Sequence, residues 1–207
     1  MRAIVPFAAE RPKTRLADVL TASERRSFAD AMLSDVLDAL RAADFSPHLL
    51  ATERQDRDVA QTVDDRPLTE AVNDALREHG ASDDEPVAVV MADLALATPA
   101  ALSRLTAGGD VVIAPGRGGG TNALVVRHPE FRVDYHGASY LDHLRAARDV
   151  GASVREVDSW RLATDVDEPE DLVEVLLHGE GASRDWLVDA GFELDTSDGR
   201  VGLTRSE

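Results

Sequence analysis

Carboxylates stand at two points in the chain where a strand is predicted to have just ended. Asp93 directly follows a wholly apolar stretch, and Asp165 and Asp167 lie two residues apart before a predicted helix. Side chains two apart in an extended segment point to the same side, and carboxylates are good ligands for a hard cation such as Mg²⁺. The alternative is structural, because Asp167 or Glu168 could cap the helix that begins at Pro169.

A basic loop follows the first predicted strand. Arg11, Lys13 and Arg15 fall within five residues of a chain that is otherwise strongly acidic, and Lys13 is its sole lysine. Arginine binds phosphate bidentately and lysine acts as a point charge, so the loop suits the phosphates of a nucleotide. A solvated basic loop is the alternative, but the absence of lysine elsewhere favours the phosphate interpretation.

A glycine-rich segment covers residues 115–122 and ends with Thr121 and Asn122. It lacks the Gly-Lys-Ser/Thr of a Walker loop, and a strand rather than a helix is predicted to follow. Consecutive glycines can still point backbone N–H groups at an anion. A plain hairpin would explain the glycines, but it would not explain polar residues at the mouth of the strand.

Two further residues stand close to these motifs. His143 lies four residues after Ser139 on a predicted helix, so it could approach an acid-binding site, but a packed or solvated histidine is an equal alternative. Arg117 in the glycine loop could touch a substrate or could simply be exposed. The sequence leaves the roles of both residues open.

The net charge of the chain limits the kinds of molecule that it is expected to bind. The chain has 207 residues, 22 Lys+Arg against 39 Asp+Glu, and a formal net charge of −17. Such a charge repels phosphate backbones and anionic lipid, so neither nucleic acid nor membrane is an expected partner. Arginine replaces lysine almost entirely, and aspartate is in surplus. Both features indicate a halophilic surface, on which molar salt would screen the repulsion between carboxylates. Genome bias towards arginine is the alternative, although it would not by itself produce this charge.

Cysteine is absent, which excludes disulfides, thiolate metal sites and a cysteine nucleophile. The amino terminus lacks the apolar core and cleavage site of a signal peptide, and no run reaches the roughly 18 apolar residues of a membrane helix. We therefore expect a soluble, cytoplasmic protein. The length fits one domain, at residues 1–180, and the change of character after Gly179 predicts a C-terminal appendage at 181–207 with a short helix and an Asp-Gly hairpin.

Short apolar runs alternate with amphipathic segments, which predicts an α/β fold with a mostly parallel sheet and helices on both faces. In such a sheet, ligands bind at the carboxyl ends of the strands, where the motifs above fall. Strands are predicted at 3–7, 48–51, 59–63, 86–91, 110–114, 122–127 and 153–157, and helices at 24–43, 67–78, 99–105, 139–149 and 169–177.

The order of the motifs resembles the 2-phospho-L-lactate guanylyltransferase family, which acts in the biosynthesis of the deazaflavin coenzyme F-420. The resemblance covers about residues 1–177, and Gly-Gly-Thr-Asn-Ala-Leu at 119–124 is its most specific element. It is carried by Pro6-Phe7, Lys13-Thr14-Arg15-Leu16, Met32–Val36, Asn73, Asp93-Leu94, residues 114–124, Ser139, His143 and residues 165–172.

The resemblance implies a nucleotide-diphospho-sugar transferase fold, similar to that of molybdenum-cofactor guanylyltransferases and GT-A glycosyltransferases. It implies GTP and 2-phospho-L-lactate as substrates, which react to give lactyl-2-diphospho-5′-guanosine and pyrophosphate. The site residues it implies are Asp93, Asp165 and Asp167 for Mg²⁺, Lys13 and Arg15 for the triphosphate of GTP, and Asn73 for its nucleoside. It also implies Thr121, through its backbone, and Ser139 for the carboxylate of the phospho-acid, with catalysis resting on the three aspartates and Lys13.

Some alternatives stay open. Phosphoenolpyruvate or 3-phosphoglycerate could replace 2-phospholactate, because these acids differ by few atoms. A non-catalytic α/β nucleotide-binding domain is the competing class. A homodimer is also left open, with the appendage as one edge that could serve it. The departures from the family pattern are Ala8, where a lysine is common, and the stretch 136–139, which is looser than the usual glycine-serine turn.

Overall fold

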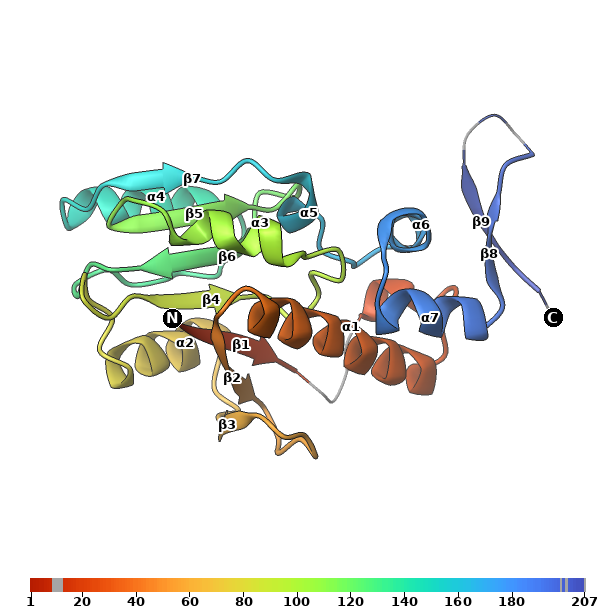
Figure 1. Cartoon of the computed structure of the whole chain (residues 1–207), viewed down its shortest axis with the longest axis horizontal. Coiled ribbons are helices and arrows are strands. Elements are labelled where there is room, and N and C mark those ends of the chain that lie inside the picture. The colour runs from red at the N-terminus through yellow and green to blue at the C-terminus, as the bar shows by residue number, and fades with distance from the viewer. Residues whose placement is uncertain (9–12, 198, 200, 207) are drawn as a thin grey trace.

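The computed structural model describes residues 1–8, 13–197, 199 and 201–206. In this part of the chain, a seven-stranded sheet has the order β3-β2-β1-β4-β6-β5-β7 (Figure 1). Adjacent strands are parallel except β6, which runs antiparallel to both of its neighbours. The mostly parallel sheet is therefore confirmed. The strands are β1 (Arg2–Phe7), β2 (Ser46–Ala51), β3 (Ala60–Val63), β4 (Val87–Val90), β5 (Val111–Pro115), β6 (Thr121–Val126) and β7 (Val154–Glu156).

Helices cover both faces of the sheet, as the sequence predicts (Figure 1). The apolar side chains of the sheet divide between two separate buried clusters, one under each set of helices. On one face lie α1 (Ala22–Ala42), α3 (Pro99–Ser103), α5 (Trp160–Ala163) and α6 (Pro169–His178), and on the other α2 (Leu68–Glu78) and α4 (Ser139–Asp149).

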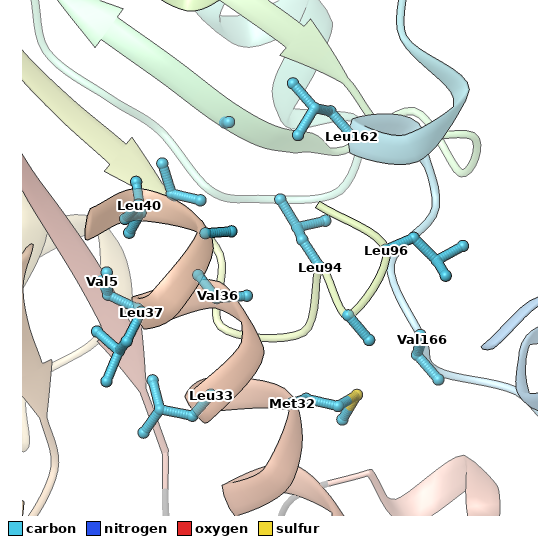
Figure 2. Close-up of a cluster of buried hydrophobic side chains, with 14 of the residues drawn as sticks. Val5, Met32, Leu33, Val36, Leu37, Leu40, Leu94, Leu96, Leu162 and Val166 are labelled. Carbon is cyan, nitrogen blue, oxygen red and sulfur yellow. The ribbon is translucent and has the colours of Figure 1, made fainter. Parts of the chain in front are cut away.

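The long helix α1 begins at the predicted capping box. The hydroxyl of Thr21 accepts from the backbone N–H of Glu24, and the backbone N–H of Thr21 donates to the Glu24 carboxylate at 2.8 Å. The apolar stripe of α1 then packs against the loop after β4 and the segment before α6, represented by Leu94 and Val166 (Figure 2). Because Leu94 and Val166 adjoin the three aspartates of interest in sequence, this packing fixes the backbone that carries them.

The glycine segment forms the turn between β5 and β6. The backbone N–H of Gly116 donates to the carbonyl of Gly120, and Gly119 takes a φ of 82°, which a residue with a side chain rarely adopts. The turn reverses the chain, so β6 is antiparallel and its first residue, Thr121, lies at the edge where β4 and β5 end. The segment is therefore both a hairpin and a means of placing polar residues at this edge.

Several elements differ from the expected ones. The predicted helix 99–105 divides into α3 and a 3₁₀ turn (Arg104–Thr106), a common way for a helix to end. The 3₁₀ helix Thr14–Leu16 and the helix α5 are too short to give a periodic signal, and the sequence did not predict them. No helix among the described residues is long and apolar enough to cross a membrane.

The last part of the chain contains α7 (Ala182–Asp189) and a two-stranded sheet of β8 (Phe192–Asp195) and β9 (Gly202–Arg205). Figure 1 shows α7 beside α1 at one end of the molecule. The strands β8 and β9 pair antiparallel, and Asp198 of the predicted Asp-Gly turn lies outside the described residues.

Asp35 on α1 caps the amino terminus of α7. Its carboxylate accepts from the backbone N–H groups of Ala182 at 2.6 Å and Ser183 at 2.9 Å, and from the Ser183 hydroxyl. Gly181 must remain small, because a Cβ there would lie 2.2 Å from an Asp35 oxygen. One side chain thus connects the last helix to the core.

We expect Asp35→Ala to destabilise the protein by about 1–2 kcal/mol, because the capped N–H groups of α7 lose their acceptor. For a chain of this size that corresponds to a fall in Tm of roughly 2–8 °C by differential scanning calorimetry. Asp38→Ala is the matched control, since Asp38 lies on the same helix and its side chain is 76% exposed. Equal melting temperatures for the two variants would contradict the capping role.

Candidate functional site

The carboxyl ends of β1 and β4 meet because these strands are adjacent and parallel. The loop after β1 carries Lys13 and the loop after β4 carries Asp93. The segment before α6, with Asp165 and Asp167, is joined to them by a hydrogen bond from the backbone N–H of Val166 to the carbonyl of Asp93. Val166 is fully buried, so the residues on either side of it are directed away from the core.

Lys13 lies between two of the predicted carboxylates. Its Nζ is 2.6 Å from Asp93 Oδ2 and 2.7 Å from Asp167 Oδ1. Burial alone would lower the pKa of Lys13, but the charges and hydrogen bonds of Asp93 and Asp167 outweigh it and raise the pKa. The lysine is therefore a permanent cation. Its backbone is left-handed, with φ 55°, which costs a residue with a side chain of order 1 kcal/mol.

The environment of Asp165 differs from that of Asp167. Burial raises the pKa of Asp165, and the negative charge of Asp93 raises it further. A hydrogen bond from Asn122, at 3.1 Å, acts in the opposite direction but does not outweigh them. Asn122 also donates to the carbonyl of Leu162 at 3.0 Å and is 5% exposed. The amide of Asn122 therefore fixes the orientation of Asp165, a role that the sequence did not predict for it.

The three predicted carboxylates meet some, but not all, of the requirements of a metal site. Among the described residues, no three acidic or histidine side chains converge on one point that could hold a metal ion. However, Asp93 Oδ1 is buried and has no hydrogen-bond partner in the described part of the chain, and Asp165 lies close enough to feel its charge. Mg²⁺ is commonly held by one or two carboxylates together with substrate phosphates. Asp93, through its second oxygen, and Asp165 fit that arrangement, whereas the two oxygens of Asp167 are engaged by Lys13 and Arg15.

The helix-capping alternative for Asp167 does not describe its side chain. The helix α6 is capped by Glu168, whose backbone N–H donates to Asp171 at 2.9 Å. The carboxylate of Asp167 instead accepts from Lys13, and from Arg15 at 3.5 Å. Arg15 is 66% exposed and lies at the rim, and Arg11 lies outside the described residues.

Thr121 and Ser139, predicted for the phospho-acid, lie together. The backbone N–H of Thr121 donates to the hydroxyl oxygen of Ser139 at 3.0 Å, and both residues are buried. Ser139 is the first residue of α4, so it lies at the positive end of a helix dipole. Because its oxygen already accepts a bond, its hydroxyl proton remains available to an anion.

His143 belongs to the same group. Its Nε2 accepts from the backbone N–H of Asp134 at 3.0 Å, so Nδ1 carries the proton and donates to the hydroxyl oxygen of Thr121 at 2.8 Å. The ring is fully buried. Burial lowers the pKa of His143 to about 4, against the charges of Asp134 and Asp142. His143 is thus a neutral residue that orients the Thr121 hydroxyl.

The depressed pKa of His143 predicts a loss of stability in acid. An unfolded histidine titrates near 6.5, so between pH 6.5 and 4 the unfolded state binds more protons, and the free energy of unfolding falls as the pH falls. We expect this group to contribute on the order of 2–3 kcal/mol to that fall. The measurement is urea unfolding at pH 7 and pH 4.5 of the wild type and His143→Asn.

The variant is expected to lose less stability than the wild type between the two pH values. His136→Asn serves as the control, because His136 is exposed and a hydrogen bond to Asp134 raises its pKa rather than lowering it. Identical pH dependence in wild type and His143→Asn would contradict the buried neutral ring.

Arg117 connects the glycine turn to the segment of the aspartates. Its guanidinium donates to Asp171, whose other carboxylate oxygen accepts from the backbone N–H of Asp167 at 3.0 Å. The side chain of Asn122 also presses on this turn, since a Cβ at Gly116 would lie 2.5 Å from its Oδ1. The turn and the aspartates are therefore held in one rigid frame.

Asn73 lies on α2, and its predicted contact with a nucleoside remains a prediction. Its Nδ2 donates to the carbonyl of Val133 at 2.9 Å, and its Oδ1 accepts from the backbone N–H of Val133 at 2.9 Å. Both ends of the amide are thus occupied. Asn73 braces the loop before α4 against α2, and it is not among the residues that line the cavity described next.

A cavity of about 430 Å³ opens beside Lys13 and the two carboxylates that it contacts. Lys13, Asp93 and Asp167 contribute to its wall, and so do Asp64 and Arg66, which follow β3. Neither Asp64 nor Arg66 was predicted from the sequence. The rule that ligands bind after strand ends could have found them, because Asp64 comes directly after the third predicted strand.

The strand order, and the lysine and carboxylates at the strand ends beside a cavity, place the chain in the class of proteins with the nucleotide-diphospho-sugar transferase fold. The fold is similar to that of a proposed nucleotide-diphospho-sugar transferase from Desulfovibrio desulfuricans G20, with a TM-score of 0.73, 16% identity, and coverage of 91% of this chain and 94% of the other.

The chain belongs to the family described as "Guanylyl transferase CofC like", whose model matches residues 1–206. A relative from Halomicrobium mukohataei, named 2-phospho-L-lactate guanylyltransferase, is 64% identical and covers 99% of this chain and 100% of its own length. A relative of the same name from Haloferax volcanii is also 64% identical, with coverage of 99% and 98%.

Proposed function

We propose that the chain transfers GMP from GTP to the phosphate of 2-phospho-L-lactate, which yields lactyl-2-diphospho-5′-guanosine and pyrophosphate. The names of its full-length relatives support this reaction. The observation that carries it is the position of Lys13, held between Asp93 and Asp167 at a cavity of the size of a small ligand. A cation and carboxylates at one point suit a reaction between two polyanions.

The nucleophile in this reaction is a phosphate oxygen. A phosphate monoester is already ionised at neutral pH, since its second pKa is near 6. The site therefore needs no general base, and its task is to place one phosphate behind the α-phosphorus of GTP and to stabilise the leaving pyrophosphate. Lys13 can exchange a carboxylate for a phosphate oxygen and donate to it as the negative charge develops.

We propose Mg²⁺ as the ion of this site, held by Asp93 and Asp165 with phosphate oxygens as the other ligands; Asp167 is the third residue that the family resemblance assigns to it. When bound, the ion would neutralise phosphate charge and align the groups for in-line displacement. The chain supplies the alignment of the ligands, since Asn122 fixes Asp165 and the backbone of Asp93 is bonded to Val166.

We propose that Thr121 and Ser139 bind the carboxylate of the phospho-acid. The Ser139 hydroxyl lies at the amino terminus of α4, where the helix dipole favours an anion. The backbone N–H of Thr121 already donates to Ser139, so Thr121 would act through its hydroxyl, which lies beside His143 of the same helix. His143 already donates to the oxygen of Thr121, so the hydroxyl proton of Thr121 is directed away from the ring. Both hydroxyls can then donate to the bound carboxylate.

The test of the substrate is pyrophosphate release with GTP and, in parallel, 2-phospho-L-lactate, phosphoenolpyruvate or 3-phosphoglycerate in molar salt. We expect 2-phospho-L-lactate to give the highest kcat/KM, by about tenfold or more, the lower end of the discrimination that a fitted site achieves between close analogues. Phosphoenolpyruvate is planar at C2, and 3-phosphoglycerate carries its phosphate on a different carbon and has an added hydroxyl. A preference for another acid would change the assigned acceptor. GTP that is not consumed with any acid would contradict the reaction.

A further inference from the structure

The cavity beside Lys13 extends across the carboxyl ends of four neighbouring strands. Thr52 follows β2 and Asp64 follows β3, while Lys13 and Asp93 follow β1 and β4. In the strand order β3-β2-β1-β4, the first and last strands are three spacings apart, or about 14 Å. The cavity thus has a charged phosphate end and a separate polar end at Asp64, the arrangement that a nucleotide requires.

The lining between the two ends is largely apolar. Phe7 and Met91 come from the ends of β1 and β4, Leu50 from β2, and Met32 from α1. Flat, apolar walls suit the faces of a purine ring, and a few polar groups at the end of such a pocket decide which ring is accepted. The polar end is therefore where base specificity arises.

Asp64 is held rigidly at that end. Its backbone N–H donates to Ala51 at 2.9 Å, which extends the pairing of β2 and β3 by one residue. Its carboxylate accepts from the backbone N–H of Arg66 at 3.0 Å and from the guanidinium, with a closest distance of 2.5 Å. Arg66 is fixed in turn by Asp74, with 2.8 Å between Nη1 and Oδ2.

The Asp64 side chain is 13% exposed, so a ligand in the cavity would meet it in a partly desolvated setting. The hydrogen bond from Arg66 lowers the pKa of Asp64 below its ordinary value. The carboxylate is therefore ionised at neutral pH and acts only as an acceptor. An acceptor-only group favours a base edge that presents donors.

Guanine presents such an edge, because its N1–H and 2-amino group both donate. Adenine presents the lone pair of N1 at the same place, which a carboxylate repels. We propose that Asp64 recognises guanine by accepting from N1–H and the 2-amino group, and that Arg66 is the positioning residue that aims the carboxylate. This inference rests on the proposed function for the nucleotide, and it names the residue that selects it.

The experiment compares the binding of GTP and inosine 5′-triphosphate, which lacks only the 2-amino group, by calorimetry without any phospho-acid. We expect the wild type to bind GTP roughly tenfold to a hundredfold more tightly, the range for a hydrogen bond to a charged group. In Asp64→Asn the ratio should fall to within about threefold. Asp65→Asn, which changes the next residue in the chain, an exposed aspartate that does not line the cavity, should keep the wild-type ratio.

Three results would overturn the inference: no discrimination by the wild type, equal weakening of both nucleotides in Asp64→Asn, or the same loss of discrimination in Asp65→Asn. If Asp64→Asn fails to fold, Asp64→Glu keeps the charge but displaces the carboxylate, and it should also reduce the ratio. Because binding is measured without an acceptor, a protein that discriminates GTP but releases no pyrophosphate would contradict the proposed reaction and leave the role of Asp64 intact.

Discussion

Asp93→Asn is expected to reduce GTP-dependent pyrophosphate release by about a thousandfold or more, at saturating GTP and phospho-acid. The substitution removes one negative charge beside Lys13, and it replaces a buried carboxylate oxygen that has no hydrogen-bond partner among the described residues. Loss of a single preorganised electrostatic group in such a site costs roughly 10²–10³ in rate, and loss of a ligand for the ion adds to that.

The fold of Asp93→Asn should stay intact. Asparagine has the same shape, Lys13 keeps its second partner Asp167, and the backbone bond between Asp93 and Val166 does not involve the side chain. Circular dichroism and Tm are the checks on folding. Asp158→Asn, an exposed aspartate elsewhere in the chain, should retain full activity. Turnover like that of the wild type in Asp93→Asn would remove the basis of the proposed mechanism.

Lys13→Met is expected to lower kcat/KM for GTP by about 10²–10³-fold. Two carboxylates would face the incoming triphosphate without the lysine that they share, and the leaving pyrophosphate would lose a donor. The comparison is Arg15→Met. Its guanidinium is 66% exposed at the rim, where charge interactions are weak and screened by salt.

We therefore expect Arg15→Met to lose less than about tenfold under the same conditions. The order of the two effects is the informative result, because both changes remove one positive charge from the same loop. A larger loss for Arg15→Met than for Lys13→Met would mean that the rim, and not the buried lysine, meets the triphosphate.

The sequence predicted the parts of the molecule that depend on local pattern. Apolar runs and periodic spacing identified the sheet and its main helices, and the strand-end rule drew attention to Asp93, Asp165 and Lys13. The structure brings these residues to one edge because β1 and β4 are parallel neighbours. Short elements such as α5 were not predicted, because four residues are too few to show a helical period of hydrophobicity.

The parts that escaped prediction depend on contacts between distant segments. Asn73 pairs with the backbone of Val133, 60 residues away, and the ion pair of Lys13 with Asp167 spans 154 residues. Neither follows from composition or spacing. The lone lysine drew attention to its loop, but only the folded chain shows that it is held by two carboxylates before any phosphate arrives.

The most direct test of the central claim follows the oxygen atoms of the reaction. The protein would be incubated with GTP and 2-phospho-L-lactate labelled with ¹⁸O in its phosphate group, and the products analysed by mass spectrometry. We predict lactyl-2-diphospho-5′-guanosine that retains every labelled oxygen, together with unlabelled pyrophosphate, because a phosphate oxygen of the acid attacks the α-phosphorus of GTP. Labelled oxygen in the pyrophosphate, or free GMP in place of the diphosphate product, would contradict that claim.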